Sequence, residues 1–136
     1  MQTSVHLAFN GQCEEAFRYY EKHLGGKIEM VMKVDESPIA GQFPPEMQKK
    51  VMHARVKVGD IALLGADAPP GRYQKPQGFS VSLAVETAAE AERLFAPLTD
   101  NGSVMMAMQE TFFAMRFGMA TDRFGIPWLV VCQKAP

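Results

Sequence analysis

The sequence has few cysteines and no excess of charge of either sign. Its two cysteines, Cys13 and Cys132, lie far apart in a chain of 136 residues. Such a pair excludes a disulfide-dense scaffold and a paired-cysteine zinc motif, and it predicts two free thiols in a reducing compartment. Lys and Arg number 14, Asp and Glu number 15, and the net charge is -1. This balance gives no electrostatic reason to expect nucleic acid or an anionic membrane as a partner.

Long apolar runs and common catalytic motifs are also missing. No segment approaches the roughly 20 apolar residues that span a bilayer. Residues 1–4 lack the basic and apolar regions of a signal peptide. We therefore expect a cytoplasmic protein without a membrane partner. The chain has no nucleophile elbow, phosphate-binding loop or zincin motif, which excludes several large enzyme classes.

The composition fits one ordinary domain with a sizeable core. Hydrophobic residues make up 47% of the chain, and ten residues are methionine. Methionine fills irregular gaps in a core and also lines adaptable apolar pockets. Both a Met-rich core and a pocket for a partly apolar ligand are therefore consistent with the composition.

The first half of the chain changes period in a fixed order. The predicted elements are a strand at 4–9, a helix that begins at Gln12 and stops at 25–26, a strand at 27–34, a loop at 35–50 with one short helical turn near Met47, and strands at 51–58 and 61–65. Gly59-Asp60 is a candidate hairpin turn between the last two strands. Prolines 44 and 45 argue against a regular helix in the long loop.

The second half repeats this order after a Pro- and Gly-rich stretch. The predicted elements are a strand at 79–85, a helix that ends at Asn101-Gly102, and strands at 103–108, 113–121 and 126–133, with a turn at 122–125. Thr87 and Glu90 fit a capping box at the start of the helix. We predict a single domain, 1–136, with a first module at about 1–67, a linker at about 68–77 and a second module at about 78–136.

Matched spacing supports an internal repeat. His6 and Gly26 are 20 residues apart, and so are Ser82 and Gly102. Helices of this length beside antiparallel strands predict an α+β fold in which the helices cover one face of each sheet. The other face of each sheet must then be buried or line a cavity.

Several segments resemble the PhnB-like branch of the glyoxalase/bleomycin-resistance, or vicinal oxygen chelate, superfamily. They are MQETFFA at 108–114, FG at 117–118, TDRFGIPW at 121–128, FNG at 9–11 with Ala16, Tyr20 and LGG at 24–26, and MHA at 52–54 ahead of GD at 59–60. The resemblance extends over nearly the whole chain. It implies two βαβββ modules with curved mixed sheets, and a homodimer in which subunit pairing helps to form a cavity.

The resemblance also raises the question of a metal. Superfamily members often hold a divalent ion with His and Glu residues, and His6 lies in the first strand where such a ligand is expected. The equivalent second-half strand offers Ser80 or Ser82 instead, and the last strand has no carboxylate. The superfamily ligand pattern is thus incomplete, and the cofactor is unknown. His6, His53 and Glu110 form an alternative candidate set.

Each candidate site residue has a functional and a structural interpretation. The candidates for ligand binding are His6, His53, Phe112, Arg116 and Trp128. The histidines are also typical of half-buried strand positions, Trp128 of a core, and Arg116 of a carboxylate pair. Glu110 would have a raised pKa in an apolar pocket and then suit acid–base catalysis, whereas in an exposed loop it would be an ordinary carboxylate.

Three functions are consistent with these residues. The first is a dimeric PhnB-like protein that binds an unknown small molecule in a Met- and Phe-lined cavity. The second is a metal-dependent lyase, isomerase or dioxygenase of the glyoxalase type. The third is a non-catalytic dimeric domain whose interior is filled by side chains. Methyl transfer is not among these functions, because the sequence contains no glycine-rich strand-to-helix turn of the kind that binds a nucleotide-like methyl donor.

Overall fold

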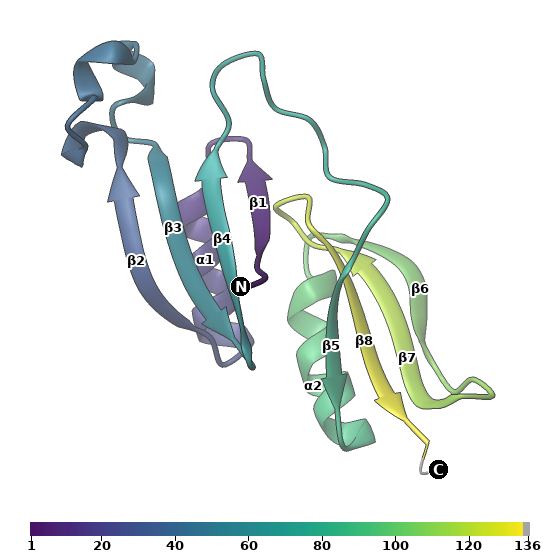
Figure 1. Ribbon diagram of the computed structural model, residues 1–136. Coiled ribbons are helices and arrows are strands. Elements are labelled where there is room, and N and C mark those ends of the chain that lie inside the picture. The colour runs from purple at the N-terminus through teal and green to yellow at the C-terminus, as the bar shows by residue number, and fades with distance from the viewer. Residues whose placement is uncertain (135–136) are drawn as a thin grey trace. The chain divides into compact units, whose positions relative to one another are not determined.

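The computed structural model describes residues 1–134, which fold into two compact units that divide after Gln74. Each unit contains one α-helix on one face of a four-stranded sheet (Figure 1). Unit 1 comprises β1 (Val5–Phe9), α1 (Cys13–His23), β2 (Lys27–Lys33), β3 (Val51–Val58) and β4 (Ile61–Asp67), with three short 3-10 helices between β2 and β3. Unit 2 comprises β5 (Val81–Val85), α2 (Ala88–Thr99), β6 (Ser103–Gln109), β7 (Ala114–Thr121) and β8 (Pro127–Gln133). The predicted α+β fold is confirmed.

Helix α1 forms because its apolar residues recur on one side. Its buried residues are Cys13, Ala16, Phe17 and Tyr20. At its start, the backbone amide of Cys13 donates to Oδ1 of Asp67 at 2.9 Å, which satisfies one of the free amides of the first turn. The helix ends where Gly25 adopts a φ of 68°, a conformation that glycine accepts without steric cost.

The sheet of unit 1 has the order β1-β4-β3-β2, with β1 and β4 parallel and the other neighbours antiparallel. Strand β4 runs two residues beyond the predicted end, because Ala66 and Asp67 pair with Ala8 and Phe9 of β1. A sequence pattern of short-range alternation does not reveal this long-range partner. The predicted strand at 51–58 matches β3 in both of its ends.

The segment between β2 and β3 is more ordered than predicted. Instead of a loop with one helical turn, it forms the 3-10 helices η1 (Val34–Glu36), η2 (Ala40–Gln42) and η3 (Pro45–Met47). The Gln48 side-chain amide donates to the carbonyls of Ala40 and Phe43 at 2.9 and 3.1 Å. These contacts satisfy backbone groups that no strand or α-helix pairs, which explains why a Pro-rich segment is held in place.

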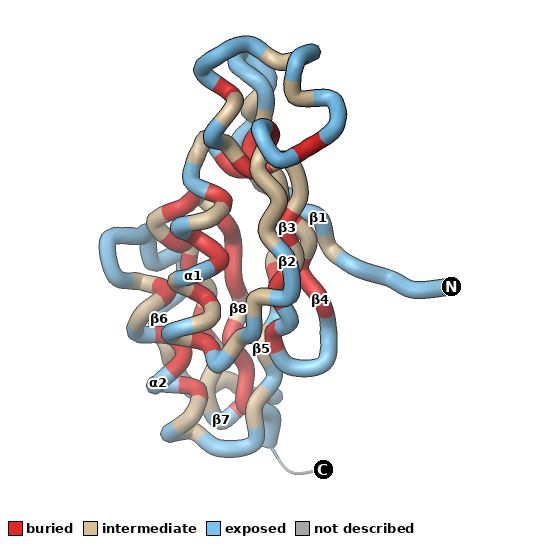
Figure 2. Tube along the Cα trace, turned by 90° about the vertical axis from the view of Figure 1, so that its left-hand side faces the viewer, coloured by how far each residue is buried: buried red, intermediate tan, exposed pale blue. Residues whose placement is uncertain are grey.

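The sheet of unit 2 has the equivalent order β5-β8-β7-β6. At the start of α2, Thr87 Oγ1 accepts the backbone amide of Glu90 at 3.1 Å, which is the threonine half of the predicted capping box. Buried residues of α2 are Ala91, Leu94, Phe95 and Leu98. In each unit, buried positions lie along the strands and on one side of the helix, between sheet and helix (Figure 2).

The strand registers place the two halves of the repeat in correspondence. In unit 1, one row across the sheet contains His6, Leu64 and Arg55. In unit 2, the equivalent row contains Ser82, Leu129 and Met119. In each unit, the next row of residues across the sheet carries a glycine under the helix. A Cβ on Gly65 would lie 2.6 Å from the Phe17 ring, and one on Gly118 would lie 2.9 Å from the Phe95 ring. Each helix thus seats one phenylalanine on a glycine of its sheet.

No α-helix among residues 1–134 combines the length and the apolar character that crossing a bilayer requires.

Candidate functional site

The face of the unit 1 sheet opposite α1 carries the two strand histidines. Because side chains alternate along a strand, the face that meets α1 takes Leu7, Gly65 and Ala54. The opposite face, called the open face below, takes His6 and Ala8 from β1, Leu64 and Ala66 from β4, and His53 and Arg55 from β3. The open face therefore mixes a few polar groups with short and branched apolar side chains.

The two histidines share the open face but are not neighbours. Strand β4 separates β1 from β3, so their backbones lie about 10 Å apart at about 4.8 Å per strand spacing. His6 is exposed and His53 is half-buried. Since β3 places Arg55, not His53, in the row of His6, the offset along the strands separates the two imidazoles further.

Neither unit by itself supplies the donors of a divalent metal site of the superfamily type among its described residues. Structural and catalytic Zn or Fe sites take at least three protein ligands. Within either unit, the described residues contain no group of three His, Cys, Asp or Glu side chains placed to hold an ion. Of the candidate set, His6 and His53 belong to unit 1 and Glu110 to unit 2.

Arg55 is the residue of the open face that the sequence did not single out as a candidate. Its Nε donates to Glu29 Oε1 at 2.7 Å, across β3 and β2, and both side chains are partly exposed. An exposed pair of this kind contributes about 0–1 kcal/mol, so it adds little to the stability of the fold. In the sequence, the alternation of His53, Arg55 and Lys57 within 51–58 is a signal that indicates a polar face on this strand.

Glu110 is an exposed carboxylate and not a buried acid. It lies just after β6, and its Oε2 pairs with Nζ of Lys134 at 3.0 Å. The hydrogen bond from Lys134 holds the pKa of Glu110 below its usual range. The raised pKa that acid–base catalysis near neutral pH requires is therefore not found, and the alternative of an ordinary loop carboxylate is the one observed.

The three ligand-binding candidates of unit 2 occupy different environments. Phe112 is exposed at the turn between β6 and β7, with its ring 5.1 Å from that of Phe113. Arg116 donates from Nε to Glu92 of α2 at 3.1 Å. Trp128 is fully buried, and its Nε1 donates to Oδ2 of Asp122 at 2.8 Å. The structure therefore does not bring these side chains together.

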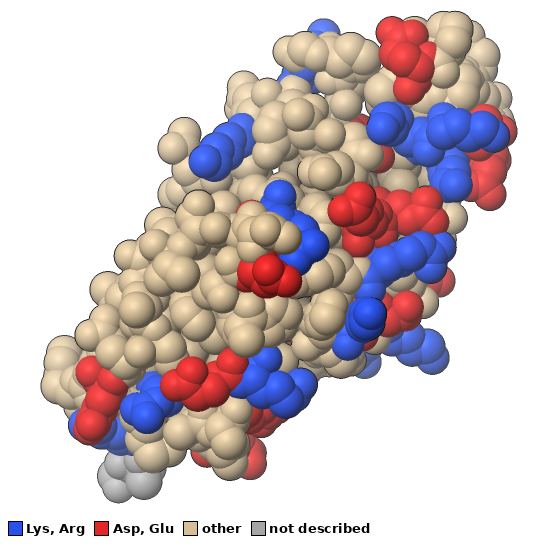
Figure 3. Space-filling model, turned by 180° about the vertical axis from the view of Figure 1, so that it is seen from behind, with Lys and Arg blue, Asp and Glu red and all other residues tan. Residues whose placement is uncertain are grey.

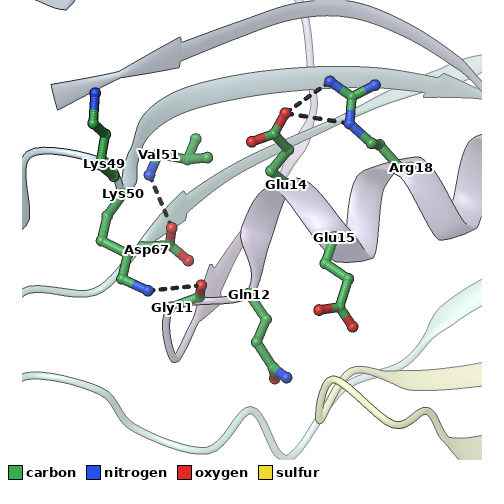
Figure 4. A pocket seen from close by; sticks show the side chains of 9 residues that line it. All are labelled: Gly11, Gln12, Glu14, Glu15, Arg18, Lys49, Lys50, Val51 and Asp67. Carbon is green, nitrogen blue, oxygen red and sulfur yellow. Dashed lines mark hydrogen bonds and ion pairs between the residues drawn. The ribbon is translucent and has the colours of Figure 1, made fainter. Parts of the chain in front are cut away.

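A hollow of about 400 Å³ opens at the start of α1 (Figure 4). It is lined by Gly11, Gln12, Glu14, Glu15, Arg18, Lys49, Lys50, Val51 and Asp67. Its charges are largely matched, since Arg18 pairs with Glu14 at 2.7 Å and Lys49 with Asp35 at 2.7 Å. The hydrogen bond from Arg18 holds the pKa of Glu14 below its usual range, although partial burial opposes this. The hollow thus offers no concentration of one charge to a ligand.

Both cysteines are free, as the sequence predicts, and both are buried. Burial raises the pKa of the Cys13 thiol far above its ordinary value, and the nearby carboxylates of Asp67 and Glu14 raise it further. We therefore expect no fast reaction of either thiol with a disulfide reagent at pH 8, and two reactive thiols after unfolding in guanidinium. One fast thiol in the native protein would contradict this placement.

The same shift predicts a pH dependence. The unfolded Cys13 thiol ionises near its ordinary value of 9.0, whereas the folded thiol stays protonated. The stability should therefore fall as the pH rises above 9.0. A Cys13→Ala variant should lack this part of the fall in stability at alkaline pH. Urea titrations of the wild type and the variant at pH 7 and pH 10 measure the difference. An equal decline in both proteins would assign the alkaline loss to other groups.

Comparison with known proteins identifies the family. The family model described as 3-demethylubiquinone-9 3-methyltransferase matches residues 1–131. Protein YjdN of Escherichia coli K12 is 34% identical over 98% of this chain and 97% of its own length. The crystal structure of PA1353 from Pseudomonas aeruginosa is 45% identical, with a TM-score of 0.89 over 99% of both chains.

More distant structures share the fold. A PhnB protein from Bacillus cereus has a TM-score of 0.78 at 20% identity, over 97% of this chain and 99% of its own. A glyoxylase/bleomycin resistance protein/dioxygenase domain from Frankia sp. EAN1pec has a TM-score of 0.64 at 14% identity, over 98% and 95%. These structures show a shared fold, and the family model, matched along residues 1–131, leads to one conclusion: the chain belongs to the family described as 3-demethylubiquinone-9 3-methyltransferase.

Proposed function

We propose that this protein binds a small organic molecule against the open face of unit 1. The observation that carries the proposal is the composition of that face. His6, His53 and Arg55 stand among Leu64 and Ala66, on the side of the sheet that α1 does not cover. Ligand sites combine a mainly apolar wall with a few polar groups that fix orientation.

The side chains of the open face favour a ligand with an apolar body and an oxygen-bearing end. Imidazoles donate or accept hydrogen bonds, and a guanidinium donates several in a fixed plane. Arg55 already donates a hydrogen bond to the carboxylate of Glu29. A ligand carboxylate or phenolate would compete with Glu29 for this donor. Leu64 supplies apolar contact between His6 and Arg55, the two polar ends of its row, and Ala66 adds apolar surface in the row of Ala8.

Methyl transfer, which the family description names, is not part of the proposal. The turn from β1 to α1 contains a single glycine, Gly11, and the first amide of α1 is accepted by Asp67. The turn from β5 to α2 contains Glu86 and Thr87 and no glycine. Neither turn offers the glycine-rich backbone that approaches a nucleotide-like methyl donor.

A metal-dependent enzyme of the glyoxalase type is the alternative, and His6 is the observation that favours it. Elemental analysis of untagged protein, before and after incubation with Zn, Mn, Fe or Ni, separates the two functions. Binding without a metal predicts much less than one ion per chain in both the native protein and a His6→Ala variant. About one ion per chain, lost in the variant, would replace the proposal with the enzyme.

The assembly and location that accompany this function are also proposals. We propose a cytoplasmic homodimer in which units 1 and 2 of each chain, joined at about 68–77, form one folding domain. The non-catalytic dimeric domain differs from this proposal only in having no ligand. The melting temperature in the presence of an amphipathic aromatic acid separates the two. A rise in the wild type that is absent in an Arg55→Ala variant supports the ligand-binding protein. No rise in either protein supports the non-catalytic domain.

A further inference from the structure

Strand β6 is an edge of the unit 2 sheet that lacks charged residues and proline. It lies at the end of the order β5-β8-β7-β6, and all of its residues except Met108 are exposed. Its sequence, SVMMAMQ, contains no charged residue and no proline. Proteins usually protect edge strands with charges or proline, because exposed edges associate with other chains.

The equivalent edge in unit 1 provides an internal comparison. Strand β2 ends the order β1-β4-β3-β2 and carries Lys27, Glu29 and Lys33. Met30 lies beside Arg55 of β3, and Met106 lies at the corresponding place beside Met119 of β7. These two methionines are 37% and 39% exposed, so the edges differ in charge and not in exposure at this position.

Most of the exposed large apolar residues of unit 2 lie on β6 or just after it, and Phe79, before β5, is the exception. We define the apolar edge as Val104, Met105, Met106, Phe112, Phe113 and Met115. Phe112 is 92% exposed and Met105 is 59% exposed. The edge that β6 forms on the right of Figure 1 lies on the left flank of Figure 3, where most of the surface is uncharged.

The area of this surface is near that of half a protein interface. At about 200 Å² for a fully exposed large side chain, the apolar edge presents roughly 600 Å². That value is at the upper limit of apolar patches on monomers, and a standard interface buries about 800 Å² per partner. The backbone and the polar side chains of β6, which adjoin the apolar edge, would supply the remaining area of such an interface.

We propose that the apolar edge is the surface by which two copies of this chain associate. The inference rests on the homodimer proposed above and identifies its contact surface. A two-fold axis places the same surface on both partners, so the surface must complement itself. An edge without charge meets this condition, because no like charges are brought together.

The rim of the apolar edge is also self-complementary. Glu110 and Lys134 lie beside it with opposite charges, 3.0 Å apart. A two-fold axis lets the lysine of one copy approach the glutamate of the other. Register shifts in β6 interrupt the regular pairing with β7, so the contact forms between side chains and not through a continuous hydrogen-bonded ladder.

Sedimentation equilibrium of Met106→Lys, Phe112→Lys and the matched control Met30→Lys tests this surface. We expect a wild-type dimer, a dimer dissociation constant raised by about tenfold or more in the first two variants, and no change in the control. Circular dichroism shows whether each variant is folded. Phe112 is 92% exposed and its ring lies 5.1 Å from that of Phe113, so its replacement separates association from folding.

The alternative outcomes separate this inference from the proposed function. A wild-type dimer that both apolar-edge variants leave unchanged would place the interface elsewhere while the homodimer stands. Dissociation by Met30→Lys as well would show that any added charge acts, which contradicts a specific surface. A wild-type monomer at about 100 μM, well above the Kd of a specific dimer, would overturn both the homodimer and its surface.

Discussion

Asp122→Ala should lower the free energy of unfolding by about 4 kcal/mol. The carboxylate is buried and binds three donors. Its Oδ1 accepts the amides of Phe124 and Ile126 at 2.9 and 3.0 Å, and its Oδ2 accepts Nε1 of Trp128. Removal leaves these donors without this acceptor in a low-dielectric interior, where each costs about 1–3 kcal/mol. Urea titration followed by Trp128 fluorescence measures the loss.

Two further variants separate the parts of this effect. Asp122→Asn keeps an oxygen for the two amides but turns an amide donor toward the Trp128 indole, so we expect a loss of about 1–3 kcal/mol. Asp60→Ala, in the exposed turn between β3 and β4, should change the stability by less than about 0.5 kcal/mol. A loss in Asp122→Ala no greater than in Asp60→Ala would show that the turn before β8 does not depend on this carboxylate.

Gly102→Ala should be the second large effect, with a loss of about 3 kcal/mol or more. Gly102 lies between the end of α2 and the start of β6. A Cβ there would collide with the Thr121 carbonyl oxygen and would lie 2.9 Å from the Leu98 carbonyl oxygen. Both obstacles are backbone atoms, so a side-chain rotation does not relieve the clash. The helix would have to move away from β7 and open the core of unit 2.

Gly41→Ala is the matched control for this glycine. Nothing lies within 4 Å of a Cβ on Gly41, and its φ is not positive. The added methyl group lowers the entropy of the unfolded chain, so we expect no change or a gain of up to about 1 kcal/mol. Thermal unfolding of the two variants beside the wild type compares them directly. Equal stabilities would mean that α2 and β7 are not in the close contact described.

Most of the fold follows from local patterns, and the differences arise where partners are distant. The spacing of Cys13, Phe17 and Tyr20 predicts α1, and the match between His6–Gly26 and Ser82–Gly102 predicts the repeat that the strand registers confirm. The extension of β4 to Asp67 depends on pairing with β1, nearly 60 residues away. The 3-10 helices at 34–47 depend on Gln48 contacts that no periodicity shows.

The candidate site was less accessible to sequence reasoning. The alternation of His53 with Arg55 correctly indicates a polar face, and the register with β4 adds His6 to it. The environment of Trp128 was not decided by alternation, because β8 is buried at five of its seven positions. Glu110 lies between two strands. Its pairing with Lys134 depends on how close the end of β6 lies to the end of β8, and local sequence patterns do not show this.

The most direct test of ligand binding at the open face is a nitrogen–proton NMR titration with 8-anilinonaphthalene-1-sulfonate, an amphipathic aromatic anion. The chain has a mass of 15.1 kDa, so resonances of single residues can be followed. The account predicts saturable shifts at His6, Leu64 and His53, weakened in an Arg55→Ala variant, while residues of α1 stay unchanged. Shifts confined to the hollow at Gln12 and Lys50, or no shifts in unit 1, would contradict it.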